Sequence, residues 1–149
     1  MEPTDNLTSL TELFNLVKYD FNNSKKYLSL YTGNDYKNFV KESDLCYQRQ
    51  KIYTDNNVDM FIITWNKNQL TPIHNHADNG CFLKVLDGCL KESIYDKDLN
   101  INKESILYKN DISFMSNNIG LHTIDNISDN ISVSLHLYSP SNFVTKFYT

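Results

Sequence analysis

Histidines that could bind a metal ion lie in two separate segments of the chain. His74 and His76 are one residue apart in the stretch HNHADNGC, and His122 follows a glycine in GLHTIDN. In an extended strand, residues two apart point to the same face, so the first two imidazoles could bind one ion. The alternatives are a surface loop for the pair and a buried structural role for His122. The two segments together favour a shared metal site.

The order of these motifs resembles that of the cupins, in which histidines from separate strands converge inside a small barrel. H-x-H is followed by a strand that ends at Gly88, and then by G-x-H-x3-N. The usual cupin pattern has a Glu a few residues after H-x-H, and Cys81 stands there instead. Three neutral histidines would leave the charge of a divalent metal without an anionic ligand. A substrate thiolate would supply that charge, and the metal would hold it deprotonated.

A strand near the end of the chain carries a second group of polar side chains. SVSLHLYSP (132–140) alternates, with its apolar residues on one face and Ser134, His136 and Tyr138 on the other. On an inward face these groups need hydrogen-bond partners. Ser134 would then fix the tautomer of His136, and His136 would orient the phenol of Tyr138 toward the metal pocket. The alternative is the polar outer face of an edge strand.

The predicted secondary structure changes from helices to strands near residue 44, and the candidate site residues lie in the β-rich part. Residues 7–41 show apolar residues at helical spacing, and Asn34 could cap a third short helix. Short β-rich segments with turn residues between them follow, at 60–65, 81–86, 90–95, 105–108, 111–115, 121–124 and 131–138. The pattern predicts a mainly β fold, one domain over 1–149 with a helical cap (1–43) and an antiparallel barrel (44–149).

Composition narrows the partners and the compartment. The net charge is −4 without a clustered basic face, which argues against nucleic acid or anionic lipid as a partner. No apolar segment approaches the roughly 20 residues of a membrane span, and the acidic, polar N-terminus does not look like a targeting signal. Three cysteines at wide spacing do not form a disulfide framework, so we expect a cytoplasmic protein. We also expect a monomer.

The segments HNHADNGCFLKVLDG, GLHTIDN and SVSLHLYSP together closely resemble the cysteine dioxygenases, from about Tyr47 to Pro140. The resemblance implies a cupin-type β-barrel (a double-stranded β-helix or jelly roll) with N-terminal helices. It also implies a non-haem iron(II) enzyme that oxidises L-cysteine with O2 to cysteine sulfinic acid. By the same resemblance the iron ligands are His74, His76 and His122.

The resemblance also implies roles around the metal. Tyr47 and Arg49 match a Tyr-x-Arg motif whose arginine binds the substrate carboxylate, and Arg49 is the only arginine of the chain. Cys81 and Tyr138 match the positions of a thioether bond beside the iron, which would also place Tyr138 against the substrate. The Ser139–Pro140 bond matches a position that is often cis. A surface charge for Arg49 and a small buried side chain for Cys81 are the alternatives.

Two other functions fit the same motifs. One is a dioxygenase for 3-mercaptopropionate or another small thiol, and the other is a non-catalytic cupin that binds a metal. The sequence departs from many family members at Gly80, where a histidine is common in eukaryotic proteins, and this chain ends soon after Pro140. The resemblance therefore does not predict how the pocket is closed.

Overall fold

The helices of the computed structural model, which describes residues 6–148, all precede residue 40 within that range. They are α1 (Leu10–Val17), η1 (Phe21–Asn23), α2 (Ser24–Leu30) and η2 (Asp35–Phe39), of which η1 and η2 are 3₁₀ helices. The predicted helical cap is therefore present as short pieces rather than as continuous helix. Leu7 is extended and forms a parallel bridge with Tyr31. The part of the prediction that covers residues 1–5 lies outside the described residues.

Asn34 occupies the N-cap position of the third helical segment, as predicted. Asn34 precedes η2 but makes no side-chain hydrogen bond to it. Its neighbour Asp35 instead accepts a hydrogen bond from the Leu10 amide at 2.8 Å and one from the Tyr31 hydroxyl at 2.6 Å. A carboxylate at the N-terminus of α1 satisfies a free amide and complements the helix dipole. This acidic side chain thus joins the first and last helical segments.

The β-region has ten strands between residues 48 and 148. They are β1 (Gln48–Thr54), β2 (Asp59–Trp65), β3 (Ile73–His74), β4 (Gly80–Asp87), β5 (Cys89–Tyr95), β6 (Ile101–Tyr108), β7 (Ile112–Met115), β8 (Leu121–Asp125), β9 (Ser132–Ser139) and β10 (Phe147–Tyr148). The seven predicted segments are all strands, although β6 starts four residues earlier than predicted. β1, β3 and β10 were not predicted, because β1 is largely polar and the other two have only two residues each.

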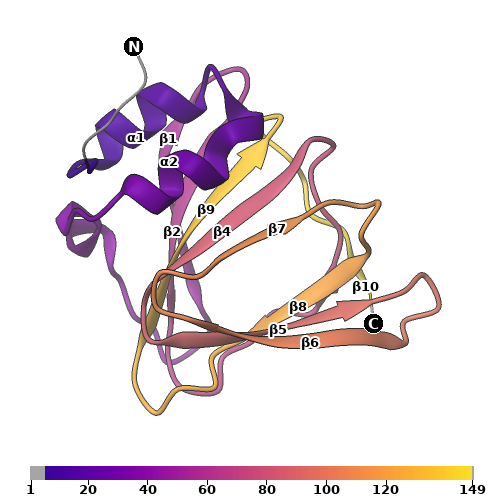
Figure 1. The fold of residues 1–149 in the computed structure, drawn as a ribbon. Coiled ribbons are helices and arrows are strands. Elements are labelled where there is room, and N and C mark those ends of the chain that lie inside the picture. The colour runs from indigo at the N-terminus through magenta and orange to yellow at the C-terminus, as the bar shows by residue number, and fades with distance from the viewer. Residues whose placement is uncertain (1–5, 149) are drawn as a thin grey trace.

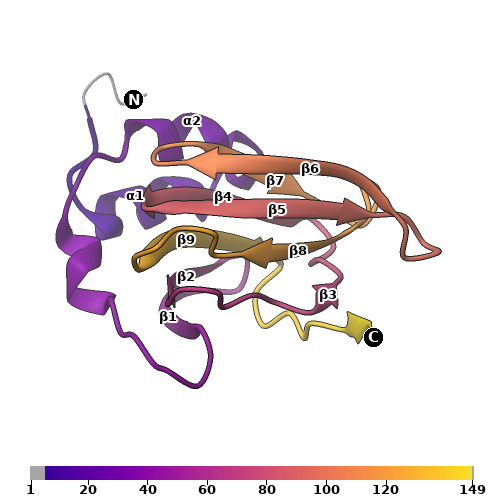
Figure 2. The ribbon, with the colours of Figure 1, turned by 90° about the horizontal axis from the view of Figure 1, so that it is seen from below.

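The strands form two five-stranded sheets that face each other (Figures 1 and 2). Their orders are β1-β2-β9-β4-β7 and β10-β3-β8-β5-β6, and every strand pair is antiparallel. Figure 1 shows α1 and α2 against the sheet that contains β9 and β4. This mainly β architecture with N-terminal helices confirms the predicted fold class.

The central strands β2, β4 and β9 have apolar contacts on both faces, because one sheet separates two hydrophobic clusters. On the outer face, Val133, Leu135 and Leu137 of β9 pack in a cluster with α1 and α2. On the inner face, Trp65 and Leu83 belong to a second cluster between the sheets. The predicted alternation of β9 is therefore confirmed, and its polar face points into the barrel. Because β9 lies between β2 and β4, it is not an edge strand.

One charged residue joins the helices to this sheet. Lys84 of β4 is 2% exposed, and its Nζ donates to the carbonyls of Leu28 at 2.6 Å and Tyr31 at 2.7 Å. Those carbonyls lie at the C-terminal end of α2, where the Leu28 carbonyl also accepts from the Tyr31 amide at 3.2 Å. Burial lowers the pKa of the Lys84 ammonium. The contact fixes the end of α2 against β4.

The connections agree with the predicted turns. Asp55 accepts hydrogen bonds from the amides of Asn57 and Val58, each at 2.8 Å, in the turn between β1 and β2. Gly88 has a φ of +77° between β4 and β5, and a side chain there would collide with Ser132. The Ser139–Pro140 peptide is cis, as the resemblance implies.

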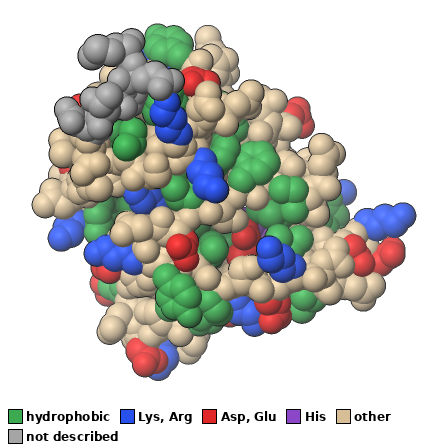
Figure 3. Space-filling model, viewed as in Figure 1, with side chains coloured by type: hydrophobic (Ala, Val, Ile, Leu, Met, Phe, Trp, Pro, Cys, Tyr) green, Lys and Arg blue, Asp and Glu red, His purple; other side chains and the backbone are tan. Residues whose placement is uncertain are grey.

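The viewed surface mixes basic, acidic and apolar side chains over the sheet and the helices (Figure 3). Within residues 6–148, no helix has the length and apolar character needed to cross a membrane.

Candidate metal centre and substrate cleft

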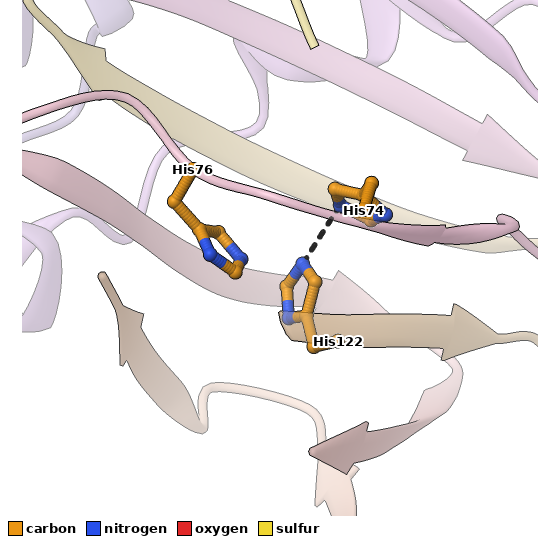
Figure 4. A group of neighbouring side chains, drawn as sticks. All are labelled: His74, His76 and His122. Carbon is orange, nitrogen blue, oxygen red and sulfur yellow. Dashed lines mark hydrogen bonds between the residues drawn. The ribbon is translucent and has the colours of Figure 1, made fainter. Parts of the chain in front are cut away.

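Three histidines converge between the two sheets. His74 is the last residue of β3 and is paired with His122 of β8. His76 lies beyond the end of β3, where Asn117 holds its backbone by accepting from its amide at 2.9 Å and donating to its carbonyl at 3.0 Å. Figure 4 shows His74 and His76 on the same segment, with both rings directed toward His122. The two side chains share a face as predicted, although only His74 belongs to a strand.

The ring nitrogens are close enough to bind one ion. One nitrogen from each of the three rings lies within 4.8 Å of the others, and this is the group that could hold a metal among residues 6–148. The Nε2 atoms of His74 and His122 are 2.9 Å apart, along the dashed line of Figure 4. Two nitrogens bound at right angles, each roughly 2.0–2.1 Å from a zinc-sized ion, would be about 2.9 Å apart. The spacing therefore suits two ligands of one metal ion.

The hydrogen bonds of these rings leave their inward nitrogens free to bind an ion. His74 Nδ1 lies 2.9 Å from the Pro72 carbonyl, which can only accept, so the proton of a neutral ring is on Nδ1. His122 Nδ1 lies 2.8 Å from a carboxylate oxygen of Glu92. Burial lowers the pKa of all three histidines to about 3, so the rings are neutral near pH 7. Lone pairs then face each other across the centre, an arrangement that a cation stabilises.

His76 gives an independent reason to place an ion here. It is 1% exposed, and neither of its ring nitrogens has a hydrogen-bond partner among the described residues. A buried polar atom without a partner is rare in native proteins and destabilises the fold. A metal bound to one of its nitrogens would satisfy it, so the donor set fits a metal ion.

The sequence did not reveal Glu92, which lies directly behind His122. Its carboxylate is buried in β5 and accepts a hydrogen bond from the Ser113 hydroxyl at 2.6 Å. Burial raises the pKa of the carboxyl, while the hydrogen bond from Ser113 lowers it. The sequence did contain a signal for Glu92. It is an acidic residue two positions after Leu90, at an inward position of an alternating strand. A carboxylate behind a metal-binding histidine orients the ring and increases its basicity.

The polar face of β9 forms a chain of hydrogen bonds that begins at an unpredicted residue, Trp65. Its indole Nε1 donates to Ser134 Oγ at 2.9 Å. Ser134 Oγ lies 2.7 Å from His136 Nε2, and His136 Nδ1 lies 3.4 Å from the hydroxyl of Tyr138. Burial holds the pKa of His136 well below its ordinary value. The structure thus brings the three predicted residues into one chain that ends at the cleft.

Cys81 and Tyr138 are directly opposite each other on β4 and β9. Side chains at opposed positions of antiparallel strands are neighbours, so the thiol of Cys81 lies beside the ring of Tyr138. Burial raises the pKa of both groups well above their ordinary values. Cys81 is 4% exposed, so its sulfur is in a protected position beside the ring. Cys46 and Cys89 are unpaired and lie outside the cleft lining.

A cleft next to the histidines has about 410 Å³ of empty space, part of it open to solvent. Arg49 lines its wall, and its guanidinium lies 4.4 Å from the ring centre of Phe61. Tyr47 stacks on Trp65 with ring centres 4.8 Å apart. Within the described part of the chain, no carboxylate is paired with Arg49. The cleft therefore combines a free cation, aromatic walls and two of the three histidines, His74 and His122.

The residues after Pro140 form a further wall of the cleft, which the sequence did not predict. Thr145 and Phe147 line it, and β10 pairs with β3 so that Phe147 is opposite His74. The side chain of Asn75 accepts from the Lys146 amide at 2.8 Å, which holds this segment against the histidine loop. The short segment after Pro140 thus contributes to closing the pocket.

Known proteins resemble this chain in sequence, and others resemble it in fold. A family model of cysteine dioxygenase type I matches residues 2–148. Cysteine dioxygenase type 1 of Danio rerio is 29% identical over 147 residues, which cover 91% of this chain and 73% of that protein. The Bos taurus protein of the same name is 43% identical over 102 residues, 59% of this chain and 51% of that protein. In that comparison the matched part spans about half the length of the relative.

Solved structures support the architecture. A conserved protein with a double-stranded β-helix domain from Klebsiella pneumoniae has a TM-score of 0.64 at 15% identity, over 76% of this chain and 93% of that one. A cupin superfamily protein from Desulfitobacterium hafniense has a TM-score of 0.58 at 7% identity, over 72% and 89%. Such low identities show the fold alone. The family match covers nearly the whole sequence, and the solved structures share the architecture. The chain therefore belongs to the cysteine dioxygenase type I family of oxygenases and has the cupin fold.

Proposed function

We propose that the protein is a non-haem iron(II) thiol dioxygenase that oxidises L-cysteine with O2 to cysteine sulfinic acid. The observation that carries this proposal is the convergence of three neutral imidazoles, without a carboxylate ligand, beside a cleft that contains an unpaired guanidinium. A metal held by neutral ligands favours an anionic guest such as a thiolate. A free amino acid thiol offers that anion together with a carboxylate for the guanidinium.

In this proposal His74, His76 and His122 hold the iron, and Glu92 orients His122. When bound, iron(II) supplies a site for the thiolate and for dioxygen, and both oxygen atoms of O2 end on the sulfur. Glu92 would also place a negative charge one hydrogen bond away from the metal ligands. This would partly offset the positive charge that the three neutral rings leave uncompensated.

Arg49 and Tyr47 would position the amino acid part of the substrate. A guanidinium offers a planar pair of N–H donors that matches a carboxylate. Tyr47 lines the same wall of the cleft, where its ring stacks on Trp65. Tyr138, which lies 5.7 Å from the guanidinium carbon by its ring centre, would contact the substrate from β9.

The phenol of Tyr138 would be held in place from two sides. Ser134 and His136 form the hydrogen-bonded chain behind it. We also propose a thioether between the Cys81 sulfur and the Tyr138 ring, supported by their opposed positions on β4 and β9. Forming it removes one hydrogen from the thiol and one from the ring, with dioxygen as the oxidant. A fixed phenol loses less conformational freedom when the substrate binds.

We further propose that residues 1–149 form a single domain, a helical cap on a barrel, that functions as a monomer in the cytoplasm. The hydrophobic cluster shared by α1, α2 and the barrel sheet supports the single domain. The three free cysteines agree with a reducing compartment.

The proposal is tested by oxygen uptake with L-cysteine and with 3-mercaptopropionate, together with the metal content and the sulfinate product. We expect iron in the purified chain, uptake with cysteine and cysteine sulfinic acid as the product. If the protein turned over 3-mercaptopropionate faster than L-cysteine, its substrate would be a thiol acid without an amine. An iron-loaded chain that oxidises neither thiol would support a non-catalytic cupin instead.

His122→Ala is the matched variant for the metal assignment. Because His122 bridges Glu92 and the metal position, its loss should remove most of the iron and the activity. The barrel should remain folded, since the hydrophobic clusters are unchanged. Full iron occupancy in His122→Ala would contradict the assignment.

A further inference from the structure

The indole of Trp65 is at the buried end of the hydrogen-bond chain that leads to Tyr138. Trp65 is the last residue of β2, is 1% exposed and donates to Ser134 Oγ at 2.9 Å. The chain continues through His136 to the Tyr138 hydroxyl. Hydroxyl groups can both donate and accept, so such a chain could run in either direction. The direction depends on the residue at its buried end.

An indole N–H can only donate, so Ser134 Oγ must accept from Trp65. The hydroxyl proton of Ser134 then needs an acceptor, and His136 Nε2, at 2.7 Å, is the one that the structure provides among residues 6–148. If His136 carried its proton on Nε2, the Ser134 oxygen would receive two donors. Its own proton would be buried without an acceptor, which is unfavourable. Nε2 of His136 is therefore the acceptor.

We propose that Trp65 is a positioning residue that fixes the direction of this chain. It sets the proton of His136 on Nδ1, so that Nδ1 donates to the Tyr138 oxygen. Tyr138 then keeps its own hydroxyl proton as a donor toward Cys81 or toward a molecule bound in the cleft. Without the indole donor, the chain could reverse, and the phenol would donate to His136 instead.

Two further contacts of these residues agree with this direction. Burial keeps His136 neutral, and a neutral imidazole has one proton, so an accepting Nε2 implies a donating Nδ1. The guanidinium of Arg49, whose carbon lies 5.7 Å from the centre of the Tyr138 ring, has donors and no acceptor. Neither neighbour can therefore take the hydroxyl proton of Tyr138 when His136 has its proton on Nδ1. The 3.4 Å separation of Nδ1 and the hydroxyl makes this a weak bond, so the stronger contacts at the buried end decide the direction.

The indole itself is held firmly. The side-chain amide of Asn126, which is fully buried, donates to the Trp65 carbonyl at 3.0 Å. The two N–H groups of this side chain are shared with the carbonyls of Asn66 and Asn130, and its oxygen accepts from Ser132. On the open side, the ring of Tyr47 stacks on the indole. The asparagine of the G-x-H-x3-N motif therefore supports the residue that orders the chain.

The catalytic consequence rests on the proposed function. A phenol that donates can stabilise negative charge on a sulfur or oxygen atom bound in the cleft, whereas a phenol turned toward His136 cannot. The proton of Tyr138 is thus kept available by a residue three hydrogen bonds away. This effect concerns the reaction step, so it should change kcat more than KM.

The direction can be measured by ¹⁵N NMR of the full chain labelled at histidine. The sequence has only four histidines. The ring signals that disappear in His136→Gln are those of His136. A protonated and a bare ring nitrogen have well-separated ¹⁵N shifts, so the tautomer is read directly and without turnover. We expect His136 to carry its proton on Nδ1 in the wild type. A wild-type spectrum with the proton on Nε2 would overturn the proposal, whatever the variants show.

Trp65→Phe keeps an aromatic ring under Tyr47 and removes the donor. We expect the Nε2–H form of His136 to appear in this variant, and kcat with cysteine to fall roughly 3- to 10-fold, as for one lost hydrogen bond, while metal content and KM stay near wild type. Tyr47→Leu is the control for packing, since it removes the stacked ring but keeps the indole donor, and its tautomer should match the wild type. A Trp65→Phe spectrum with only the Nδ1–H form would show that another group sets the direction. If the wild type did not oxidise cysteine, the proposed function would fail, and the tautomer would still decide this inference.

Discussion

The imidazole of His122 lies between two neighbours that determine which of its nitrogens is bare. Glu92 faces Nδ1 at 2.8 Å, and His74 faces Nε2 at 2.9 Å. His74 has the same arrangement, with the Pro72 carbonyl next to its Nδ1. At the scale of single residues, the candidate metal centre is therefore prepared by hydrogen bonds on its outer side. Each of these bonds directs a lone pair inward.

Glu92→Gln should weaken metal binding because the amide keeps the shape of the carboxylate but not its charge. Loss of an outer partner of a ligand histidine typically costs roughly 10- to 100-fold in metal affinity, and we expect a loss in this range. The measurement is a competition titration against a chelator with the metal-free chain. The matched control is Glu104→Gln on β6, a carboxylate that is 46% exposed and pairs with Lys91 on the surface. Equal affinities for the two variants would contradict a role for Glu92.

Arg49→Ala should weaken the use of cysteine. A charge-assisted hydrogen bond contributes roughly 1.5–3 kcal/mol, or about 10- to 150-fold in binding. Arg49 is exposed at the mouth of the cleft, where water screens its charge, so we expect the lower part of this range. Arg49→Lys should restore little, because an ammonium lacks the planar pair of donors. Kinetics with cysteine give the change, and Lys109→Ala on an exposed turn is the control.

Cysteamine separates a carboxylate contact from a general loss of activity. It has no carboxylate, so the wild type should use it poorly, and Arg49→Ala should make little further difference. If the wild type oxidised cysteamine as well as cysteine, Arg49 would not be the carboxylate anchor, and the substrate assignment would fail with it.

Cys81→Ser should abolish any thioether while preserving the fold, because serine fits the same space. Intact-mass analysis of the wild type should show a species lighter by two hydrogens, and its share should grow after turnover. The same species in Cys81→Ser would place the bond elsewhere. Its complete absence from the wild type after turnover would leave Cys81 as a packing residue. Cys89→Ser, at an unpaired cysteine outside the cleft, is the control.

At the scale of elements, β4 and β9 serve two environments at once. Their outer faces pack on α1 and α2, and their inner faces present Cys81, Ser134, His136 and Tyr138 to the barrel. If the register of one of these strands shifted by one residue, its inward and outward side chains would exchange faces. The helical cap therefore fixes the register in which the inward side chains meet.

Lys84→Met tests how strongly β4 holds the cap. Methionine keeps most of the length and apolar contact of the side chain but leaves the carbonyls of Leu28 and Tyr31 without this donor. A buried group that loses its partner costs roughly 1–3 kcal/mol, so the free energy of unfolding should fall by at least that amount. Chemical denaturation measures it, with the exposed Lys109→Met as the control. If both variants lost equal stability, water would be replacing the ammonium.

At the scale of the whole molecule, helices and barrel share one of the two hydrophobic clusters. That cluster includes Leu13 and Leu28 from the helices and Ile62, Phe82 and Leu135 from the sheet. Separating the cap would expose the outer faces of three central strands. The cap and the barrel should therefore fold together.

We expect a single unfolding transition in denaturant. Trp65 is the only tryptophan and is buried between the sheets, so its fluorescence reports on the barrel, while far-ultraviolet circular dichroism also reports on the helices. The two signals should have the same midpoint, because a two-state domain loses all of its structure together. A helical signal lost at a lower denaturant concentration than the fluorescence would show that the cap unfolds independently.

Residues whose chemistry depends on type and local spacing could be identified without the fold. H-x-H, the alternation of 132–140 and the glycine at 88 predicted the shared face of two histidines, the inward row of β9 and the turn after β4. These features survive because side-chain direction in a strand follows from backbone geometry alone. The β-rich segments were likewise found from their own composition, whereas the polar β1 was missed.

The distant residues that complete the site could be identified only from the folded chain. Glu92, Trp65 and Phe147 are 30, 69 and 73 residues away in the chain from His122, Ser134 and His74, the residues they contact or face. No local pattern encodes such pairings, because they arise when strands from separate hairpins pack into two sheets. The same packing brought the Asp35 carboxylate to the start of α1, a contact that the local sequence did not indicate. The candidate metal centre was thus visible in the sequence as a set of three histidines, and the groups that orient their rings became visible only in the folded barrel.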